Sequence, residues 1–449
     1  MQSGGKSYLF VTVVAACTAI AGLLFGYDVA VMNGALVYLR TDFHLGPVTT
    51  EFLTAIMFVG AAFGSIVFGW ASDRFGRRAA LFSAGLLFAV AAFTAASSGQ
   101  IATLMTARFL AGMAIGATLL VAPLYISEIA PAHRRGLLVT LNQLLIVIGT
   151  LTGFIVSYEL ATIAPGSWRL MFILGGTPAI ALCLAMLWIP ESPRWLLQKG
   201  RVEQAAAVLR KVAPEDDVQV TIAEITKAIR EESGTYGELL SKALRKPMVL
   251  AVMLAIIQQV TGVNTVLYYG AIIFAENTGA SASQAIGMNV VVGAVNLVFT
   301  IFGLLLIDKL GRRPLLLLAT GGMAVSLIAF AVLLNTMAGH ASLLLLPILC
   351  YVACFAFGLG TGVWVCMAEL FPNRIRGRAL SISNMALWIA VTVLTATFLT
   401  LTKMFSTAGV FMGYAVICVL SFAYIYIKLP ETKNRTLEEI EASWSSEKA

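Results

Sequence analysis

Charged residues are scarce in this chain of 449 residues. They make up 12% of it, about half of the roughly 25% that is usual in soluble domains. Hydrophobic residues make up 59%, so too few polar side chains exist to cover a water-soluble globule of this size. The composition therefore predicts that most of the chain's perimeter lies in lipid.

The sequence also lacks the motifs of enzymes and metalloproteins. Its six cysteines fall within apolar runs and show no spacing typical of a metal site or a disulfide framework. It contains no Gly-x-x-x-x-Gly-Lys-Ser/Thr loop and no nucleophile motif. We therefore expect no metal and no cofactor, and these absences argue against a membrane enzyme or an ATP-driven pump.

What the sequence does contain is a series of long apolar runs. In hydrocarbon the backbone groups must bond to one another, and runs of this length indicate helices. We predict an all-α membrane protein with twelve transmembrane helices. The predicted spans are residues 8–36, 51–71, 79–98, 101–124, 137–158, 168–189, 247–275, 284–307, 314–337, 342–367, 378–401 and 406–428.

Basic residues gather at alternate ends of these spans. Arg77 and Arg78 follow the second span, and Arg312 and Arg313 follow the eighth, whereas the opposite loops hold only scattered cations. Basic loops remain in the cytoplasm, so we predict that both termini and the long polar segment after the sixth span are cytoplasmic. This bias accounts for the net charge of +7, and no nucleic-acid partner is needed.

Three motifs of the first half return in the same order in the second half, roughly 240 residues later. The pairs are Asp73-Arg-Phe-Gly-Arg-Arg78 with Asp308-Lys-Leu-Gly-Arg-Arg313, Glu128-Ile-Ala-Pro-Ala-His-Arg-Arg-Gly136 with Glu369-Leu-Phe-Pro-Asn-Arg-Ile-Arg-Gly377, and Pro190-Glu-Ser-Pro193 with Pro430-Glu-Thr-Lys433. Such a parallel repeat is typical of transporters made of two six-helix halves.

The repeat and the polar segments divide the chain into four parts. We predict one six-helix bundle at residues 1–192, a second at 247–430 and a cytoplasmic tail at 431–449. Residues 193–246 are predicted to form amphipathic linker helices on the cytoplasmic face, over Arg201–Arg210 and Val218–Glu232. A regulatory docking site in this linker is the alternative, and no residue pattern favours it.

Two charges lie within apolar runs, where an ionised side chain is costly and is a functional candidate. Asp28 interrupts the first span, and Arg108 lies about seven residues inside the fourth. Counted from the outer ends, Arg108 is at a depth of about 10 Å and Asp28 at about 12–16 Å, so the two can pair. Protonating Asp28 would free Arg108, which is the two-state behaviour that a proton-coupled carrier needs. A static structural ion pair is the alternative.

Further charges lie at cytoplasmic helix ends, where they can reach water without any special role. Because they recur in both halves, we predict that they pair between the halves when the cytoplasmic side is closed. These predicted gate residues are Asp73, Arg77, Glu128, Arg135, Glu191, Asp308, Arg312, Glu369 and Arg376.

Amide side chains cluster in the middle of several spans. Gln143 follows Gly136 by seven residues and Asn384 follows Gly377 by seven, so the halves present amides at matching positions. The seventh span adds Gln258, Gln259 and Asn264, the eighth adds Asn296, and Trp364 follows glycines in the tenth. We expect Gly262 to loosen the seventh span, with Thr261 and Asn264 bonding the freed backbone groups. Amides that donate and accept, together with an aromatic face, favour a neutral polyhydroxylated solute. Amides that only hold helices together are the alternative.

These residues resemble the sugar-porter family of the major facilitator superfamily over almost the whole chain. The resemblance includes Phe25-Gly-Tyr-Asp28, Gln258-Gln-Val-Thr-Gly-Val-Asn264 and the repeated motifs above. It implies alternating access by two six-helix bundles around a central sugar site. The sugar contacts implied by the resemblance are Phe25, Gln143, Gln258, Gln259, Asn264, Tyr268, Tyr269, Asn296, Gly360, Trp364 and Asn384.

The residue at position 28 separates subtypes of this family. Proton-coupled bacterial members have Asp there, whereas the animal facilitators have Asn, so Asp28 resembles the symporters. We therefore predict a monomeric symporter of a proton and a hexose or pentose in the inner membrane of a bacterium. The alternatives are a proton-independent uniporter, a symporter of myo-inositol or another polyol, and a sugar sensor that does not transport.

Overall fold

The computed structural model describes residues 2–131, 134–164, 166–212, 217–231, 236–241, 244–336, 341–371, 373–431 and 433. Over these residues, helices are the only regular secondary structure. Eleven continuous helical segments in this part of the chain are long and apolar enough to cross a membrane. The prediction of an all-α membrane protein is confirmed.

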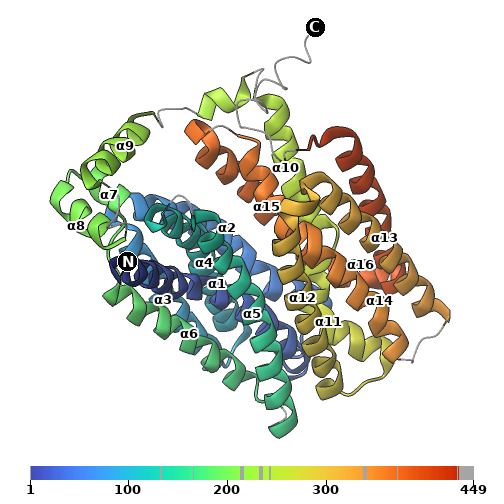
Figure 1. Ribbon diagram of the computed structural model, residues 1–449. Helices are drawn as coiled ribbons and strands as arrows, with labels where there is room; N and C mark the ends of the chain where they lie inside the picture. Colours follow the sequence, from blue (N-terminus) through green and yellow to red (C-terminus); the bar gives the residue numbers. More distant parts are fainter. Residues whose placement is uncertain are drawn as a thin grey trace. The chain divides into compact units, whose positions relative to one another are not determined.

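The first half of the chain forms six long helices, as predicted (Figure 1). Most are longer than the predicted spans, because polar turns at their ends continue the helix beyond the apolar run. The helices are α1 (Gln2–Asp42), α2 (Pro47–Phe75), α3 (Arg77–Ala96), α4 (Ile101–Ile129), α5 (Arg135–Ile163) and α6 (Trp168–Trp188).

The segment between the halves contains short helices, of which two were predicted. They are α7 (Pro193–Gln198), α8 (Val202–Val212), α9 (Val218–Glu231) and a 3₁₀ turn at Tyr236–Leu240. Helix α7 was not predicted from the sequence, although its start carries two signals common at helix starts. Pro193 occupies the first turn, and the Ser192 hydroxyl accepts a hydrogen bond from the Trp195 N–H. Of the break that the sequence predicts between the two linker helices at residues 213–217, residues 213–216 lie outside the described residues.

The second half contains interrupted helices. The seventh span is divided into α10 (Arg245–Val260) and α11 (Val263–Thr278), and the tenth into α14 (Ala341–Cys354), a π-helical turn (Phe355–Leu359) and α15 (Gly360–Glu369). The eighth and ninth spans are α12 (Ala282–Leu310) and α13 (Arg312–Thr336).

The last helix, α16 (Asn373–Lys428), contains two spans. It has 56 residues, which at 1.5 Å per residue is more than twice the roughly 30 Å of a hydrocarbon core. Ser406 interrupts it with a φ of 64° and a ψ of 161°. The eleven continuous segments therefore make twelve crossings, with the last turn falling at the boundary predicted between residues 401 and 406.

The helices pack into two compact units, and each unit combines segments from more than one part of the chain. One unit contains Met1–Val31, Ile56–Gly153 and Ser167–Ser233. The other contains Gly234–Ala449 together with Met32–Ala55 and Phe154–Gly166, which are the ends of α1, α2 and α5 that are predicted to face outward. These three helix ends therefore pack with helices of the second half.

Candidate functional site

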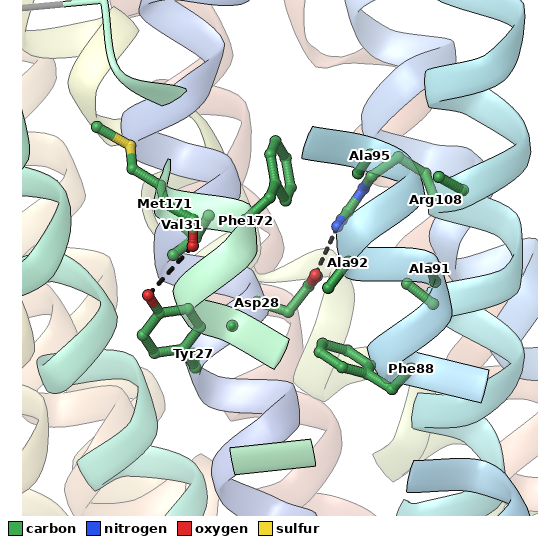
Figure 2. A pocket seen from close by; sticks show the side chains of 13 residues that line it. Tyr27, Asp28, Val31, Phe88, Ala91, Ala92, Ala95, Arg108, Met171 and Phe172 are labelled. Atoms are coloured by element: carbon green, nitrogen blue, oxygen red, sulfur yellow. Dashed lines mark hydrogen bonds and ion pairs between the residues drawn. The ribbon is translucent and has the colours of Figure 1, made fainter. Parts of the chain in front are cut away.

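Asp28 of α1 and Arg108 of α4 form a buried ion pair in the first unit (Figure 2). Arg108 Nη1 lies 2.6 Å from Asp28 Oδ1, and the two residues are 4% and 1% exposed. The pair that helix depth predicted is thus present. One atom of each partner, Asp28 Oδ2 and Arg108 Nε, has no hydrogen-bond partner in the described structure. The pair is therefore buried without being fully satisfied.

Small residues bring α4 close enough to α2 to hold Arg108 in place. A Cβ added to Gly112 would lie only 2.0 Å from the Met57 carbonyl oxygen, so the two backbones touch at this point. Met57 also approaches the guanidinium, with its sulfur 3.0 Å from Arg108 Nη2. On the other side, the Arg108 guanidinium carbon lies 6.0 Å from the centre of the Phe172 ring. Arg108 thus has soft contacts that do not depend on the charge of Asp28.

A cavity of about 10 Å³ lies beside the ion pair, lined by residues of α1, α3, α4 and α6. Its volume is that of about one water molecule. Phe88, Phe172 and several alanines form most of its wall, as Figure 2 shows. The site can accommodate a proton or a water molecule, and it is too small for a sugar.

The amides of the seventh span lie at the break between α10 and α11. Gly262 makes this break with a φ of 93°, which a side chain would strain, and a Cβ there would lie 2.5 Å from the Tyr414 ring. Gln259 lies one residue before the end of α10, with its Nε2 3.3 Å from Gln258 Oε1. Asn264, in the first turn of α11, donates a hydrogen bond to Gln259 Oε1. The break thus groups three amides.

Of the two side chains expected to bond the backbone groups freed by this break, Thr261 does so and Asn264 has another partner. Thr261 Oγ1 donates to the Gln258 carbonyl at 3.2 Å, as predicted, but the described hydrogen bond of the Asn264 side chain is to the Gln259 side chain. Thr265 Oγ1 supplies the bond expected of Asn264, to the Gly262 carbonyl at 2.6 Å. The Tyr351 hydroxyl donates to the Thr261 carbonyl at 2.8 Å. The Asn264 amide is therefore part of the polar cluster, and Thr265 takes its expected place as a partner of the backbone.

The tenth span meets this cluster. Gln258 Nε2 donates to the Leu359 carbonyl at 3.0 Å, where the π-helical turn ends. Gly360 follows it and is buried, whereas Trp364, one turn later in α15, is 39% exposed. Asn296 of α12 is 8% exposed, and the buried Asn384 Oδ1 of α16 has no hydrogen-bond partner in the described structure.

The remaining predicted sugar contacts are divided between the two units. Tyr268 and Tyr269 are fully buried in α11, and the Tyr269 hydroxyl donates to the Thr395 carbonyl at 2.7 Å. Phe25 and Gln143 are half-buried and belong to the first unit. Gln258, Gln259 and Asn264 are thus brought together by hydrogen bonds within the second unit.

In the second unit, the ends of α1, α2 and α5 carry polar contacts that no motif indicated. Asn33 of α1 is 1% exposed, and its Nδ2 donates to the Leu267 carbonyl at 2.8 Å. Its Oδ1 accepts from the Ala271 N–H at 3.1 Å, and its Nδ2 also lies 3.4 Å from Asn289 Oδ1 of α12. Next to these bonds, Ala161 of α5, Ala271 and Ile286 form a small apolar cluster. A single amide in a long apolar helix, such as Asn33, has no sequence pattern around it that would predict these contacts.

At the ends predicted to be cytoplasmic, Arg77 is the centre of a first arginine cluster with Asp73, Glu128 and Glu191. Arg77 lies 2.8 Å from Asp73 Oδ1 and 3.1 Å from Glu128 Oε1. Glu191 accepts hydrogen bonds from the backbone N–H groups of Arg77 and Arg78. Burial raises the pKa of Glu191 above its usual range, although these N–H groups and Arg77 counteract the rise.

A second arginine cluster repeats this arrangement with Asp308, Arg312, Glu369 and Glu431. Arg312 lies 2.8 Å from Asp308 Oδ1 and 2.9 Å from Glu369 Oε1. Glu431 accepts from the N–H groups of Arg312 and Arg313 at 3.1 Å, a role that the sequence analysis did not assign to it. Both clusters therefore pair within one half of the chain. Pairing between the halves remains a prediction for the state in which the cytoplasmic side is closed.

The other two predicted gate residues differ from these clusters. Arg135 is exposed at the start of α5. Arg376 is half-buried in α16 and donates to the Phe371 carbonyl at 3.2 Å. Arg135 forms no described ion pair with the clusters, whereas Arg376 interacts electrostatically with Glu369 of the second cluster.

Comparison with known proteins agrees with this architecture. The family model "Sugar (and other) transporter" matches residues 14–444. The D-xylose-proton symporter of Escherichia coli is 35% identical over 481 residues, covering 98% of this chain and 97% of the relative. The probable metabolite transport protein CsbC of Bacillus subtilis is 36% identical over 432 residues, covering 95% and 92%.

Solved structures show the same fold. The xylose transporter XylE from E. coli, in a partially occluded inward open conformation, superposes with a TM-score of 0.85 at 31% identity. The match covers 95% of this chain and 99% of that one. The fold is thus that of a multi-pass major facilitator transporter, with twelve transmembrane helices in two parallel six-helix halves. The chain belongs to the sugar transporter family, whose members are transporters and not enzymes.

Proposed function

We propose that this protein carries a neutral monosaccharide, a hexose or a pentose, together with a proton by alternating access. The observation that carries the proposal is the buried Asp28–Arg108 pair beside a cavity of about 10 Å³. A buried carboxylate paired with one cation has two charge states that differ in what the cation contacts. Among the relatives, the D-xylose-proton symporter of E. coli and the arabinose-proton symporter of B. subtilis support the same assignment.

The proposed cycle uses Asp28 as the proton site. When Asp28 is ionised, Arg108 is held at Oδ1. When Asp28 takes a proton, Arg108 loses that partner and retains Met57 and Phe172. Sugar binds at the amides of the second half, together with Phe25 and Gln143 of the first. The six-helix bundles, residues 1–192 and 247–430, then expose this site alternately to either side of a bacterial inner membrane, with both termini in the cytoplasm.

Uptake into proteoliposomes with an imposed proton gradient, acid outside, tests the proposal. We expect the protein to accumulate one of a panel of hexoses, pentoses and inositols, by up to about tenfold for each imposed pH unit at one proton per sugar. Asp28→Asn keeps the shape of the side chain but cannot exchange a proton, so we expect it to retain sugar exchange and to lose accumulation. Asp42→Asn, the same change at an exposed position of the same helix, is the matched control.

The alternatives give different results in this assay. A wild-type protein that equilibrates sugar without ever accumulating it is a uniporter, and accumulation of inositols in preference to aldoses identifies a polyol symporter. Binding of sugar without any flux indicates a sensor.

A further inference from the structure

A groove lies between the end of α3 and the start of α6, both in the first unit. It shares no lining residue with the cavity beside Asp28 and Arg108. Its volume of about 560 Å³ falls within the range of sites that bind small molecules, roughly 300–1,000 Å³. Val90 and Phe93 of α3 and Ile173 of α6 line it as exposed apolar side chains. Much of its wall is therefore apolar.

The groove runs from the ends of both helices into the membrane span. Helix α3 ends at Ala96 and α6 begins at Trp168, and both of these ends are predicted to face outward. Val90 lies six residues before Ala96, which is about 9 Å along the helix. We therefore expect the mouth of the groove at the boundary between water and hydrocarbon, and its apolar inner end among the acyl chains of the lipid.

Arg169 lines the groove in the first turn of α6, and its guanidinium is held by two uncharged partners. Nη2 donates to the Ser98 carbonyl at 3.2 Å, and the guanidinium carbon lies 4.1 Å from the centre of the Trp168 ring. Arg40, at the same side of the membrane, is paired with Glu276 at 2.8 Å, whereas Arg169 forms no ion pair in the described part of the chain. A guanidinium has five N–H groups, so several of them are available to an anion.

The other polar side chains of the groove are uncharged. Thr94 Oγ1 donates to the Val90 carbonyl at 2.8 Å, and Ser97 Oγ donates to the Thr94 carbonyl at 3.3 Å. Among the described residues, no carboxylate lines the groove. It therefore offers a cation to a phosphate group but no anion to an ammonium group, which favours a lipid headgroup with a net negative charge.

We propose that this groove is a binding site for an anionic phospholipid, in the leaflet that faces outward in the predicted orientation. The phosphate accepts hydrogen bonds from the Arg169 guanidinium at the mouth. One acyl chain lies along Val90, Phe93 and Ile173. The bound lipid then bridges α3 and α6 on the surface of the first unit, and its binding does not depend on the proposed sugar and proton transport.

Quenching of a local fluorophore by labelled lipids tests this inference. After the six native cysteines are replaced, a fluorophore is attached to a cysteine at Leu170, an exposed position of α6 next to Arg169. The protein is placed in phosphatidylcholine vesicles with a few per cent of either phosphatidylglycerol or phosphatidylcholine that carries a nitroxide near the headgroup end of one acyl chain. We expect phosphatidylglycerol to be enriched about tenfold over phosphatidylcholine at this position, on the order of one charge-assisted hydrogen bond.

Two variants separate the charge from the groove. Arg169→Gln removes the cation, and Ser97→Phe fills the groove while keeping Arg169; we expect each to abolish the enrichment. A fluorophore at Met404 of α16, beside the exposed Lys403, is the matched control for a cation at an outer helix end, and both lipids should quench it nearly equally.

Three results would overturn the inference. Enrichment that persists in Arg169→Gln would exclude recognition of the phosphate by this arginine. Equal enrichment at Leu170 and Met404 would mean that any exposed cation attracts the lipid. Displacement of the lipid by inorganic phosphate, beyond the effect of sodium chloride at the same ionic strength, would identify a site for soluble anions.

Discussion

At the scale of single residues, the membrane part of this protein contains two carboxylates in different electrostatic surroundings. Asp28 is buried against the fixed charge of Arg108 at 2.6 Å, whereas Glu51 is buried against a backbone N–H and a hydroxyl. Asp28 is thus held by a single charged partner, whereas Glu51 is held by one residue of another helix.

Replacing Arg108 tests how much this cation stabilises the protein by pairing with the buried Asp28 carboxylate. Arg108→Gln leaves a buried carboxylate without its cation, which we expect to destabilise the protein by about 3–5 kcal/mol at neutral pH. Protonation removes the unpaired charge, so we expect the stability of this variant to increase as the pH falls. The measurement is the thermal unfolding midpoint of the purified protein between pH 5 and pH 8. The double variant Asp28→Asn with Arg108→Gln carries neither charge, and a pH response that persists in it would contradict this explanation.

The site residues that could be predicted from the sequence are those whose charge or polarity is unusual for the segment that contains them. Asp28 and Arg108 are single charges in long apolar runs, so burial could be inferred without knowing their neighbours. Glu51 lies four residues after Pro47, close to a helix end where an acid is ordinarily exposed. Its burial results from Thr400, some 350 residues away in the chain, and a contact of that kind has no local pattern. Asn33 was missed for the same reason.

At the scale of the elements, the seventh span owes its polar cluster to a break and not to a continuous helix. Gly262 takes a left-handed φ of 93° that separates α10 from α11. The break places Gln259 at one helix end and Asn264 at the next helix start, where their side chains meet. In the sequence, Gly262 indicated that the helix could break at this point. The partners of the freed carbonyls depend on packing against Tyr351 and could not be predicted.

Gly262→Ala tests the need for this break. A left-handed non-glycine residue costs about 1–2 kcal/mol, and here the added Cβ would also lie 2.5 Å from the Tyr414 ring. We expect lower stability and at least tenfold weaker sugar binding, measured by thermal unfolding and calorimetric titration. Gly279→Ala is the matched control, because Gly279 has a φ of 66° with no atom within 4 Å of an added Cβ. Equal losses in the two variants would mean that backbone strain alone, and not the packing around the amides, explains the effect.

At the scale of the whole molecule, the two halves repeat the same arginine cluster but carry different polar groups within their membrane spans. Each half has an arginine cluster in which a carboxylate from a later segment, Glu191 or Glu431, binds two backbone N–H groups at a helix start. The repeat was visible in the sequence because these motifs are local. The Asp28–Arg108 pair belongs to the first half and the broken seventh span to the second, so the buried ion pair and the amide cluster are found in different halves of the repeat.

The arginine clusters provide the last prediction, which concerns the cytoplasmic side. Glu128 is 4% exposed at its side chain, whereas Glu369 is 27% exposed and so has more freedom to take a partner from the other half. We expect Glu369→Gln to weaken closure of the cytoplasmic side and to shift the protein toward the inward-facing state. Labelling of a single cysteine in the cytoplasmic part of the amide-lined site should then become several-fold faster from the cytoplasmic side. Glu224→Gln, on an exposed position of linker helix α9, is the control. Unchanged labelling in Glu369→Gln would mean that this cluster only holds its own half together.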